Sequence, residues 1–332
     1  MKVVSCFAGL GGGELALKQL GFKTEVYAYE IDVYAEAVNR FHNSDNTTYL
    51  GDITKWREHT DLIGDGIDLI MGGSPCQDLS GANVQGEGKC GAGLCGSRSG
   101  LFYTFIDILN HYKPRYYFLE NVASMTTENK NKMSAIMGHD PYVVDARTVS
   151  GMMRKRLFWT NIPFEPIKDR GIKIQDILSF GKYPKEKAYT IAATYTNASL
   201  NRDYFASHRP MKFIPLDEDN VSRYEREWGY NSINSRVVKV ENGKVNFKDA
   251  ELLKKRKHID DVGNLEDGFY RLEKFTLNEV EQCFTLPIDY TRYGKFADGT
   301  EKQISNTQRY KMIGNGWVID VIKEFFKNIG DY

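Results

Sequence analysis

The first 119 residues alternate short apolar runs with amphipathic stretches, and this rhythm constrains the fold more than any other feature of the chain. Apolar runs bounded by turn residues are typical of buried strands, and an apolar stripe at helical spacing is typical of a packed helix. We expect strands at 2–7, 25–29, 67–71 and 116–119, and helices at 14–20, 32–41 and 101–112. The alternation predicts an α/β fold with a parallel, doubly wound sheet that binds ligands at the carboxyl ends of its strands.

Length and composition are compatible with one large domain and a smaller lobe. The chain has 332 residues, of which 41% are hydrophobic and 27% charged. No signal peptide and no membrane-spanning apolar run is visible, so we expect a cytoplasmic protein. The five cysteines lack paired spacing, which predicts neither a disulfide framework nor a metal site. Cys90 and Cys95 lie in the glycine-rich stretch 81–100, where a mobile loop is expected and small-residue roles outweigh metal binding.

The later part of the chain has a different character. From about 167 to 270 it is polar and lacks regular periodicity, which predicts a separate lobe, whereas 275–284 and 318–329 return to helical patterns. The net charge is zero, so composition alone does not indicate a nucleic-acid-binding protein. The basic runs at 154–156 and 254–258 are either a basic face or solvated surface.

A glycine-rich turn, Phe7 to Gly13, joins the first expected strand to the first helix. Glycines there let a ligand approach the backbone and leave the helix N-terminus open to it, although the spacing is not the Gly-x-Gly-x-x-Gly of dinucleotide-binding proteins. Glu30 ends the second strand where such folds bind ribose hydroxyls, and Asp52 ends a further short strand. The pattern indicates an adenosine-containing ligand, with tight turns and helix caps as the alternative interpretation.

Three further residues are expected at the same sheet edge. Cys76 follows a buried strand in a Gly/Pro turn, where a thiolate could act as a nucleophile, although a lone cysteine is more often a small buried residue. Glu120 ends the next strand and could protonate or hydrogen-bond a ring nitrogen. Arg154 and Arg156 alternate on an expected strand, so they share one face and could meet a carbonyl oxygen or a phosphate.

In order, the chain reads Phe-x-Gly-x-Gly-Gly, Glu, Gly-Asp-Ile, Ser-Pro-Cys, Glu-Asn-Val, Arg-x-Arg and a late Gly-Asn, and so resembles the cytosine-5 DNA methyltransferases. The resemblance covers 1–165 and about 272–328. Its spacing is close to that of bacterial and phage enzymes, and details around Pro75-Cys76 lean toward the animal de novo branch. It implies a Rossmann-like catalytic domain at 1–165, completed by 272–332, and a smaller, irregular target recognition domain at 183–270.

The resemblance also implies roles for individual residues. Cys76 would add to C6 of a flipped cytosine, Glu120 would contact N3, and Arg154, with Arg156, would contact O2 and activate the site. The implied cofactor is S-adenosylmethionine, without a metal. The residues expected to bind it are Phe7, Ala8, Gly9, Leu10, Gly11, Glu30, Ile31, Asp52, Ile53, Pro75, Leu101, Asn315 and Val318.

For target recognition, the resemblance implies double-stranded DNA as the partner, a monomeric enzyme, and a nucleoid-associated location in a bacterial or phage setting. A restriction endonuclease companion is a further expectation. The residues expected to contact DNA are Ser80, Asn197, Asn201 and Arg202, with an ordinary polar loop as the alternative for the last three. Other readings are an RNA-methylating member of the family, an inert DNA-binding relative and, least of all, an NAD-dependent oxidoreductase. One departure from the family pattern is Met152, where a glutamine is usual.

Overall fold

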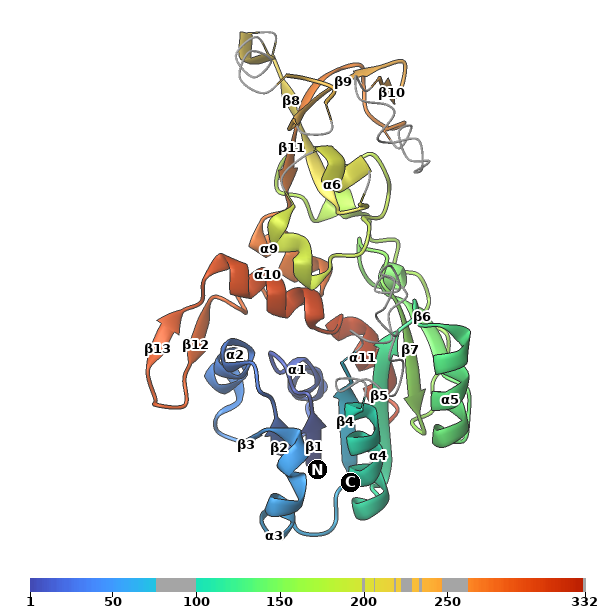
Figure 1. Ribbon diagram of the computed structural model, residues 1–332, viewed down its shortest axis with the longest axis vertical. Helices are drawn as coiled ribbons and strands as arrows, with labels where there is room; N and C mark the ends of the chain where they lie inside the picture. The colour runs from blue at the N-terminus through green and yellow to red at the C-terminus, as the bar shows by residue number, and fades with distance from the viewer. Residues whose placement is uncertain are drawn as a thin grey trace, which may run out of the picture.

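The computed structural model describes residues 1–75, 100–198, 201–205, 207–217, 219–221, 229–232, 235–246 and 262–330. Figure 1 shows a main body around one large sheet and a smaller lobe at the far end of the long axis. Helices α9 (Leu277–Cys283) and α10 (Asn306–Asn315) lie between the two. The expected α/β class is confirmed, because the large sheet is dominated by parallel pairs.

Seven strands of the described chain form the main sheet, in the order β3-β2-β1-β4-β5-β7-β6. The pairs from β3 to β5 are parallel, and β7 is antiparallel to both of its neighbours. The order reverses between β1 and β4, which is where ligands bind in sheets of this kind. The strands are β1 (Lys2–Cys6), β2 (Glu25–Tyr29), β3 (Thr47–Gly51), β4 (Leu69–Gly73), β5 (Tyr116–Val122), β6 (Tyr142–Asp145) and β7 (Lys155–Thr160).

Both faces of this sheet are covered, because successive apolar side chains of each inner strand point to opposite sides. Val3 of β1 packs in the cluster that contains α1 (Gly12–Gln19), α2 (Val33–Asn43) and α11 (Ile319–Phe326). Val4, the next residue, packs in the other cluster. That second face carries η1 (Ile53–His59), α3 (Thr60–Ile63), α4 (Leu101–Tyr112) and α5 (Thr127–Met137). The result is a three-layer body with the ligand edge left open.

Local sequence explains several element boundaries. Asp32 caps α2, since its side chain accepts hydrogen bonds from the backbone N–H groups of Tyr34 and Ala35. Strand β2 and helix α4 have the predicted bounds. Helix α10 was not predicted, because its mixed polar sequence has only weak amphipathic character.

The smaller lobe is more regular than its polar composition indicated. A four-stranded antiparallel sheet runs in the order β10-β9-β11-β8. Tyr270 and Leu272 are buried at alternate positions of β11, and three consecutive residues of β8, Met211 to Phe213, are buried as well. Its strands are β8 (Met211–Leu216), β9 (Val237–Glu241), β10 (Lys244–Val245) and β11 (Gly268–Lys274).

Short elements complete the described chain. They are η4 (Ala146–Thr148), η5 (Ile174–Asp176), η6 (Ala193–Asn197), α6 (Asn201–Phe205) and the hairpin of β12 (Tyr293–Lys295) and β13 (Glu301–Gln303). Among the described helices, none has the length and apolar character needed to span a membrane. The described residues also contain no cluster of three or more side chains that could bind a metal ion.

Candidate active site

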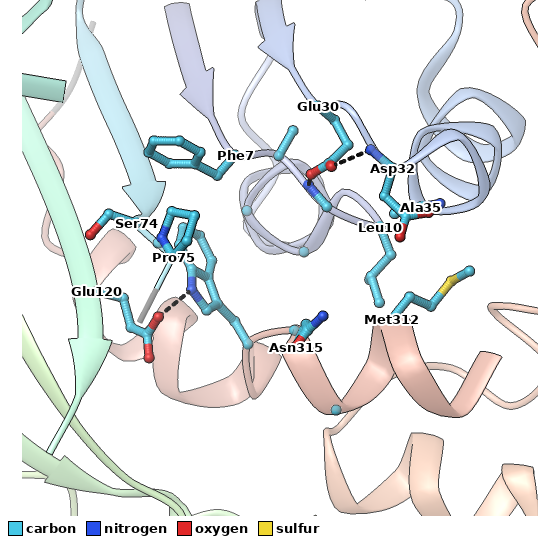
Figure 2. A pocket seen from close by; sticks show the side chains of 18 of the residues that line it. Phe7, Leu10, Glu30, Asp32, Ala35, Ser74, Pro75, Glu120, Met312 and Asn315 are labelled. Carbon is cyan, nitrogen blue, oxygen red and sulfur yellow. Dashed lines mark hydrogen bonds between the residues drawn. The ribbon is translucent and has the colours of Figure 1, made fainter. Parts of the chain in front are cut away.

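A pocket lies at the carboxyl ends of β1, β4 and β5, at the point where the strand order reverses. Its cavity has a volume of about 260 Å³. Figure 2 shows Glu30 and Asp32 toward one end and Glu120 and Pro75 toward the other, with Asn315 between them. The pocket therefore has two chemically different halves, one at the turn after β1 and one beside β5.

In the first half, a carboxylate closes the glycine-rich turn. Glu30 accepts hydrogen bonds from the backbone N–H groups of Gly9 (2.8 Å), Ile31 (2.9 Å) and Asp32 (2.7 Å). Gly9 has φ +58°, a conformation that glycine adopts without a steric penalty. Burial raises the pKa of Glu30, and the three N–H donors offset this only in part. This half offers an acceptor for hydroxyl groups beside the apolar side chains of Phe7 and Leu10.

Asp32 lies at the rim of the same half. It accepts a hydrogen bond from Nζ of Lys311 at 2.7 Å, which ties the start of α2 to α10. Burial opposes the charge on Asp32, but the bonds from Lys311 and from the N-terminal turn of α2 outweigh it and lower its pKa. The rim of this half therefore carries an ionised carboxylate at neutral pH.

In the second half, Glu120 has both carboxylate oxygens engaged. Oε1 pairs with Nε of Arg156 at 2.8 Å, and Oε2 accepts a hydrogen bond from Nε1 of Trp317 at 3.2 Å, drawn as a dashed line in Figure 2. Strand pairing explains the ion pair, since Val122 lies opposite Arg156 and Glu120 is two residues earlier on β5. The side chains of Glu120 and Arg156 are 12% and 17% exposed, so the pair is shielded but open to the cavity.

Asn121 of β5 connects this half of the pocket to the turn that follows β4. Its Nδ2 donates hydrogen bonds to the carbonyl oxygen (3.3 Å) and the hydroxyl oxygen (2.9 Å) of Ser74. Both side chains are buried, and Pro75 lines the pocket directly after Ser74. The turn that leads into Cys76 is therefore held beside Glu120.

Arg154 has a different environment from Arg156. Its guanidinium is buried and donates to the carbonyl oxygens of Ile191 (3.0 Å), Gly314 (3.1 Å) and Gly316 (3.0 Å). It also lies over the ring of Phe284, 4.8 Å from its centroid. Arg154 thus anchors the link between α10 and α11 to the start of β7, although it also lines the pocket.

The Glu120–Arg156 pair and the Ser74-Pro75 turn lie at one sheet edge, beside a glycine-rich turn closed by Glu30. These features follow the order of the motifs in the sequence. The family model of the C-5 cytosine-specific DNA methylases matches residues 1–139. The first 139 residues of the chain are therefore similar to this family. The methyl donor of C-5 cytosine methylases is S-adenosylmethionine, and the first half of the pocket fits that cofactor. Its apolar walls suit an adenine ring, and Glu30 provides an acceptor for ribose hydroxyls.

Relatives with sequence similarity come from phages and bacteria. The orphan methyltransferase M.SPRI of Bacillus phage SPR is 27% identical over 268 residues, covering 74% of this chain and 59% of that protein. The orphan methyltransferase M.Rho11sI of Bacillus phage rho11s is 33% identical over 165 residues, 49% of this chain and 31% of that protein. The type II methyltransferase M2.BsuMI of Bacillus subtilis is 36% identical over 157 residues, 45% and 37% of the two. The chain thus spans between 31% and 59% of the length of these relatives.

Solved structures of methyltransferases share the fold along the whole chain. Entamoeba histolytica EhMeth superposes with a TM-score of 0.58 at 13% identity, covering 99% of this chain and 97% of that one. Dnmt2 of S. pombe has a TM-score of 0.52 at 14% identity, covering 99% and 98%. At such identities the likeness establishes the fold alone.

Seven of the cofactor residues expected for a cytosine methylase line the pocket: Phe7, Ala8, Gly9, Leu10, Glu30, Pro75 and Asn315. The other six lie outside its lining. Ile31 is 74% exposed at the rim, and Gly11 has φ +83° with its α-carbon facing Asn39. Asp52 caps η1 through Thr54. The remaining three are buried or half-buried in the packing around the pocket: Ile53, Leu101 and Val318.

Two of the expected catalytic residues meet each other, and one cannot be placed. Glu120 and Arg156 form the ion pair, and Arg154 lies nearby with its guanidinium on backbone carbonyls. Cys76 and Ser80 fall outside the described residues, as do Cys90, Cys95 and the basic run at 254–258. Met152, where the family usually has glutamine, is fully buried, and its sulfur accepts a hydrogen bond from the N–H of Ile191.

The expected DNA-contacting residues have contrasting environments. Asn197 is exposed at the end of η6. Asn201 is fully buried, and its Nδ2 donates to Ser232, Ser235 and Val237, so in this conformation it supports the lobe and is not presented to a base. Arg202 lies on α6, and its side chain is not among those described.

Sequence reasoning missed Trp317, Asn121 and Met312, all of which line the pocket. Asn121 could have been predicted, because it lies in the Glu-Asn-Val motif directly after Glu120. Trp317 follows the late Gly-Asn by two positions, but its contact with Glu120 joins residues 197 positions apart and has no local signal.

Proposed function

We propose that this chain transfers a methyl group from S-adenosylmethionine to carbon 5 of a cytosine in DNA, with Cys76 as covalent nucleophile. The observation that carries the proposal is the Glu120–Arg156 pair, held beside the Ser74-Pro75 turn at the open edge of the sheet. The similarity of residues 1–139 to the C-5 cytosine-specific DNA methylases and the fit of the first half of the pocket to the cofactor support it further.

The proposed chemistry divides between the two halves of the pocket. The thiolate of Cys76 forms a bond to C6 of the cytosine, which makes C5 electron-rich enough to accept a methyl group. When bound, S-adenosylmethionine supplies that methyl group from its sulfonium. Loss of the C5 proton to water then restores the C5–C6 double bond and breaks the bond between Sγ and C6.

Glu120 and Arg156 would act on the other side of the ring. A carboxyl group bound to N3 and a guanidinium near O2 would stabilise the charge that builds up on the ring during attack at C6. The geometry favours Arg156 over Arg154 as the guanidinium that faces the base, because Arg156 pairs with Glu120 while Arg154 is occupied by backbone carbonyls. Glu30 would bind the ribose of the cofactor.

Residues 1–165 with 272–332 would form the catalytic domain in this scheme, and 183–270 the part that selects the DNA sequence. A single chain would act on double-stranded DNA. The target base must leave the helix to reach the pocket, at a cost of a few kcal/mol in stacking and pairing. The exposed Asn197 is the described candidate for contact with DNA.

A trapping experiment tests this function. Duplex DNA carrying 5-fluorocytosine lacks the C5 proton whose loss releases the enzyme, so the wild-type chain with S-adenosylmethionine should form a denaturation-resistant adduct. Cys76→Ser should form none. RNA of the same sequence is tested in parallel with labelled cofactor. This comparison shows whether the chain methylates DNA or RNA. Absence of both adduct and methyl transfer with the wild type would refute the proposal.

A further inference from the structure

Trp317 occupies the boundary between the two halves of the pocket. It lies on the link between α10 and α11, and its ring lies close to the first turn of α1, the end of β4 and the middle of β5. A Cβ added to Gly13 would lie 3.1 Å from Cζ3 of the indole, and one added to Gly73 would lie 3.0 Å from Nε1. The ring also packs edge-on against Phe118, with centroids 5.5 Å apart. Close packing on these sides leaves the indole little freedom to rotate.

Gly73 leaves the space that the hydrogen bond between Trp317 and Glu120 occupies. A Cβ at Gly73 would come within 2.9 Å of Oε2 of Glu120 as well as 3.0 Å of the indole nitrogen. Only a residue without a side chain at the end of β4 therefore leaves room for the hydrogen bond. Because Arg156 engages the other oxygen, the two donors together set the plane of the carboxylate.

The backbone that carries Trp317 is itself held in place. Arg154 donates to the carbonyl oxygens of Gly314 and Gly316, the latter directly before Trp317. The two arginines of the Arg-Lys-Arg run thus both help to position Glu120, one directly and one indirectly. Arg156 contacts Glu120, and Arg154 fixes the link from which the indole reaches Glu120.

We infer that Trp317 is a positioning residue for methyl transfer, whose indole N–H orients the Glu120 carboxylate toward the target base. The inference rests on the proposed function, since it assigns a partner to the acid of that reaction. The N–H group is the part of the side chain that matters for this role, and the aromatic ring serves to hold it in place. Removal of the N–H should slow the chemical step and leave cofactor binding unchanged, because the Glu30 half of the pocket is untouched.

The test replaces Trp317 by 3-benzothienylalanine, in which sulfur takes the place of the N–H within a ring of nearly the same size, and also uses Trp317→Phe. Single-turnover methyl transfer is measured with saturating DNA and cofactor, and calorimetry gives the Kd for S-adenosylmethionine. We expect both variants to lose roughly tenfold or more in rate, as for loss of a hydrogen bond to a charged group. The benzothienylalanine variant should bind the cofactor within about twofold of wild type, since it keeps the ring.

Trp159→Phe is the matched control. Its indole N–H also donates over 3.2 Å, but to the neutral Oγ of Ser134 on the far side of the sheet, so the substitution removes an indole hydrogen bond away from the pocket. Its transfer rate should stay near wild type. A benzothienylalanine enzyme with the wild-type rate would overturn the inference, even if Trp317→Phe were slow, because the ring alone would then suffice. An inactive wild-type chain would instead refute the proposed function.

Discussion

At the scale of single residues, Arg154 and Arg156 show how two positions in one short run acquire different chemistry. Arg154 precedes β7 and is 5% exposed, with its guanidinium on three carbonyl oxygens. Arg156 lies within β7 and meets a carboxylate at the cavity. Removing a buried donor leaves its acceptors unsatisfied, whereas removing a pocket cation mainly changes the charge that a substrate meets.

We therefore predict that Arg156→Gln lowers methyl transfer by roughly a hundredfold, as for loss of a donor that stabilises a transition state, with little loss of stability. Arg154→Met should instead lower the free energy of unfolding by about 1–3 kcal/mol, because its carbonyl partners lose their donor. Urea unfolding and single-turnover transfer measure the two effects. Equal loss of stability in both variants would contradict this division.

Glu14 is a second residue whose setting has a measurable consequence. It is buried under the glycine turn, and neither carboxylate oxygen has a hydrogen-bond partner among the described residues. Burial raises its pKa above the usual value. A raised pKa in the folded state means that stability is greatest below the unfolded-state pKa and declines as pH rises toward the folded-state pKa.

We predict that Glu14→Gln, which mimics the protonated acid, makes the chain more resistant to urea at pH 8 and changes its resistance less at pH 5. The slope of stability against pH should flatten over the range above the usual glutamate pKa. Glu25→Gln, at an exposed position on β2, is the control and should leave the slope unchanged. Greater destabilisation by Glu14→Gln at pH 8 than at pH 5 would contradict this prediction, because it would mean that the ionised Glu14 carboxylate stabilises the folded chain.

At the scale of elements, α10 is the helix on which the pocket and the lobe meet. The helix packs so closely against η6 that Gly314 faces backbone atoms. A Cβ added to Gly314 would lie 2.5 Å from the carbonyl carbon of Ala192 and from the nitrogen of Ala193. Alanine normally favours a helix over glycine by about 1 kcal/mol. Here that preference is outweighed, because backbone cannot move aside as a flexible side chain can.

Gly314→Ala should accordingly destabilise the chain by about 1–3 kcal/mol, the usual range for overpacking, and should also weaken cofactor binding, because Gly314 and Asn315 line the pocket. Gly263→Ala is the matched control, since a Cβ there meets nothing within 4 Å. Urea unfolding and calorimetric titration with S-adenosylmethionine provide the measurements. A more stable Gly314→Ala chain would show that helix propensity decides at this position.

At the scale of the whole molecule, one buried ion pair joins the lobe to the main body. Lys212 of β8 lies 3.1 Å from both carboxylate oxygens of Glu279 on α9, and each side chain is 1% exposed. Glu279 also accepts hydrogen bonds from Ser179 and Thr276, and these donors together with Lys212 outweigh burial and lower its pKa. The charge is therefore compensated from three segments of chain at the junction.

Breaking such a pair from one side leaves an uncompensated buried charge, so Lys212→Met should reduce the free energy of unfolding by about 3–5 kcal/mol. Lys182→Met is the control: its pair with Glu266 is exposed on both sides, and its loss should cost less than about 1 kcal/mol. Urea unfolding monitored by tryptophan fluorescence compares the two. Similar midpoints would mean that the buried pair is not needed to hold the lobe.

The sequence by itself determined much of the layout of the main body. Apolar periodicity acts over a few positions, so strands β1, β2, β4 and β5 and the placing of Glu30 and Glu120 near strand ends could be predicted. Strand β6 was not predicted. The lobe sheet and α10 could not be predicted, because their stability comes from packing against distant segments and not from local pattern. The tertiary structure alone decided which arginine meets Glu120, brought Trp317 to the same acid, and buried Asn201 inside the lobe. Such contacts depend on strand register and helix docking, which spacing along the chain does not encode.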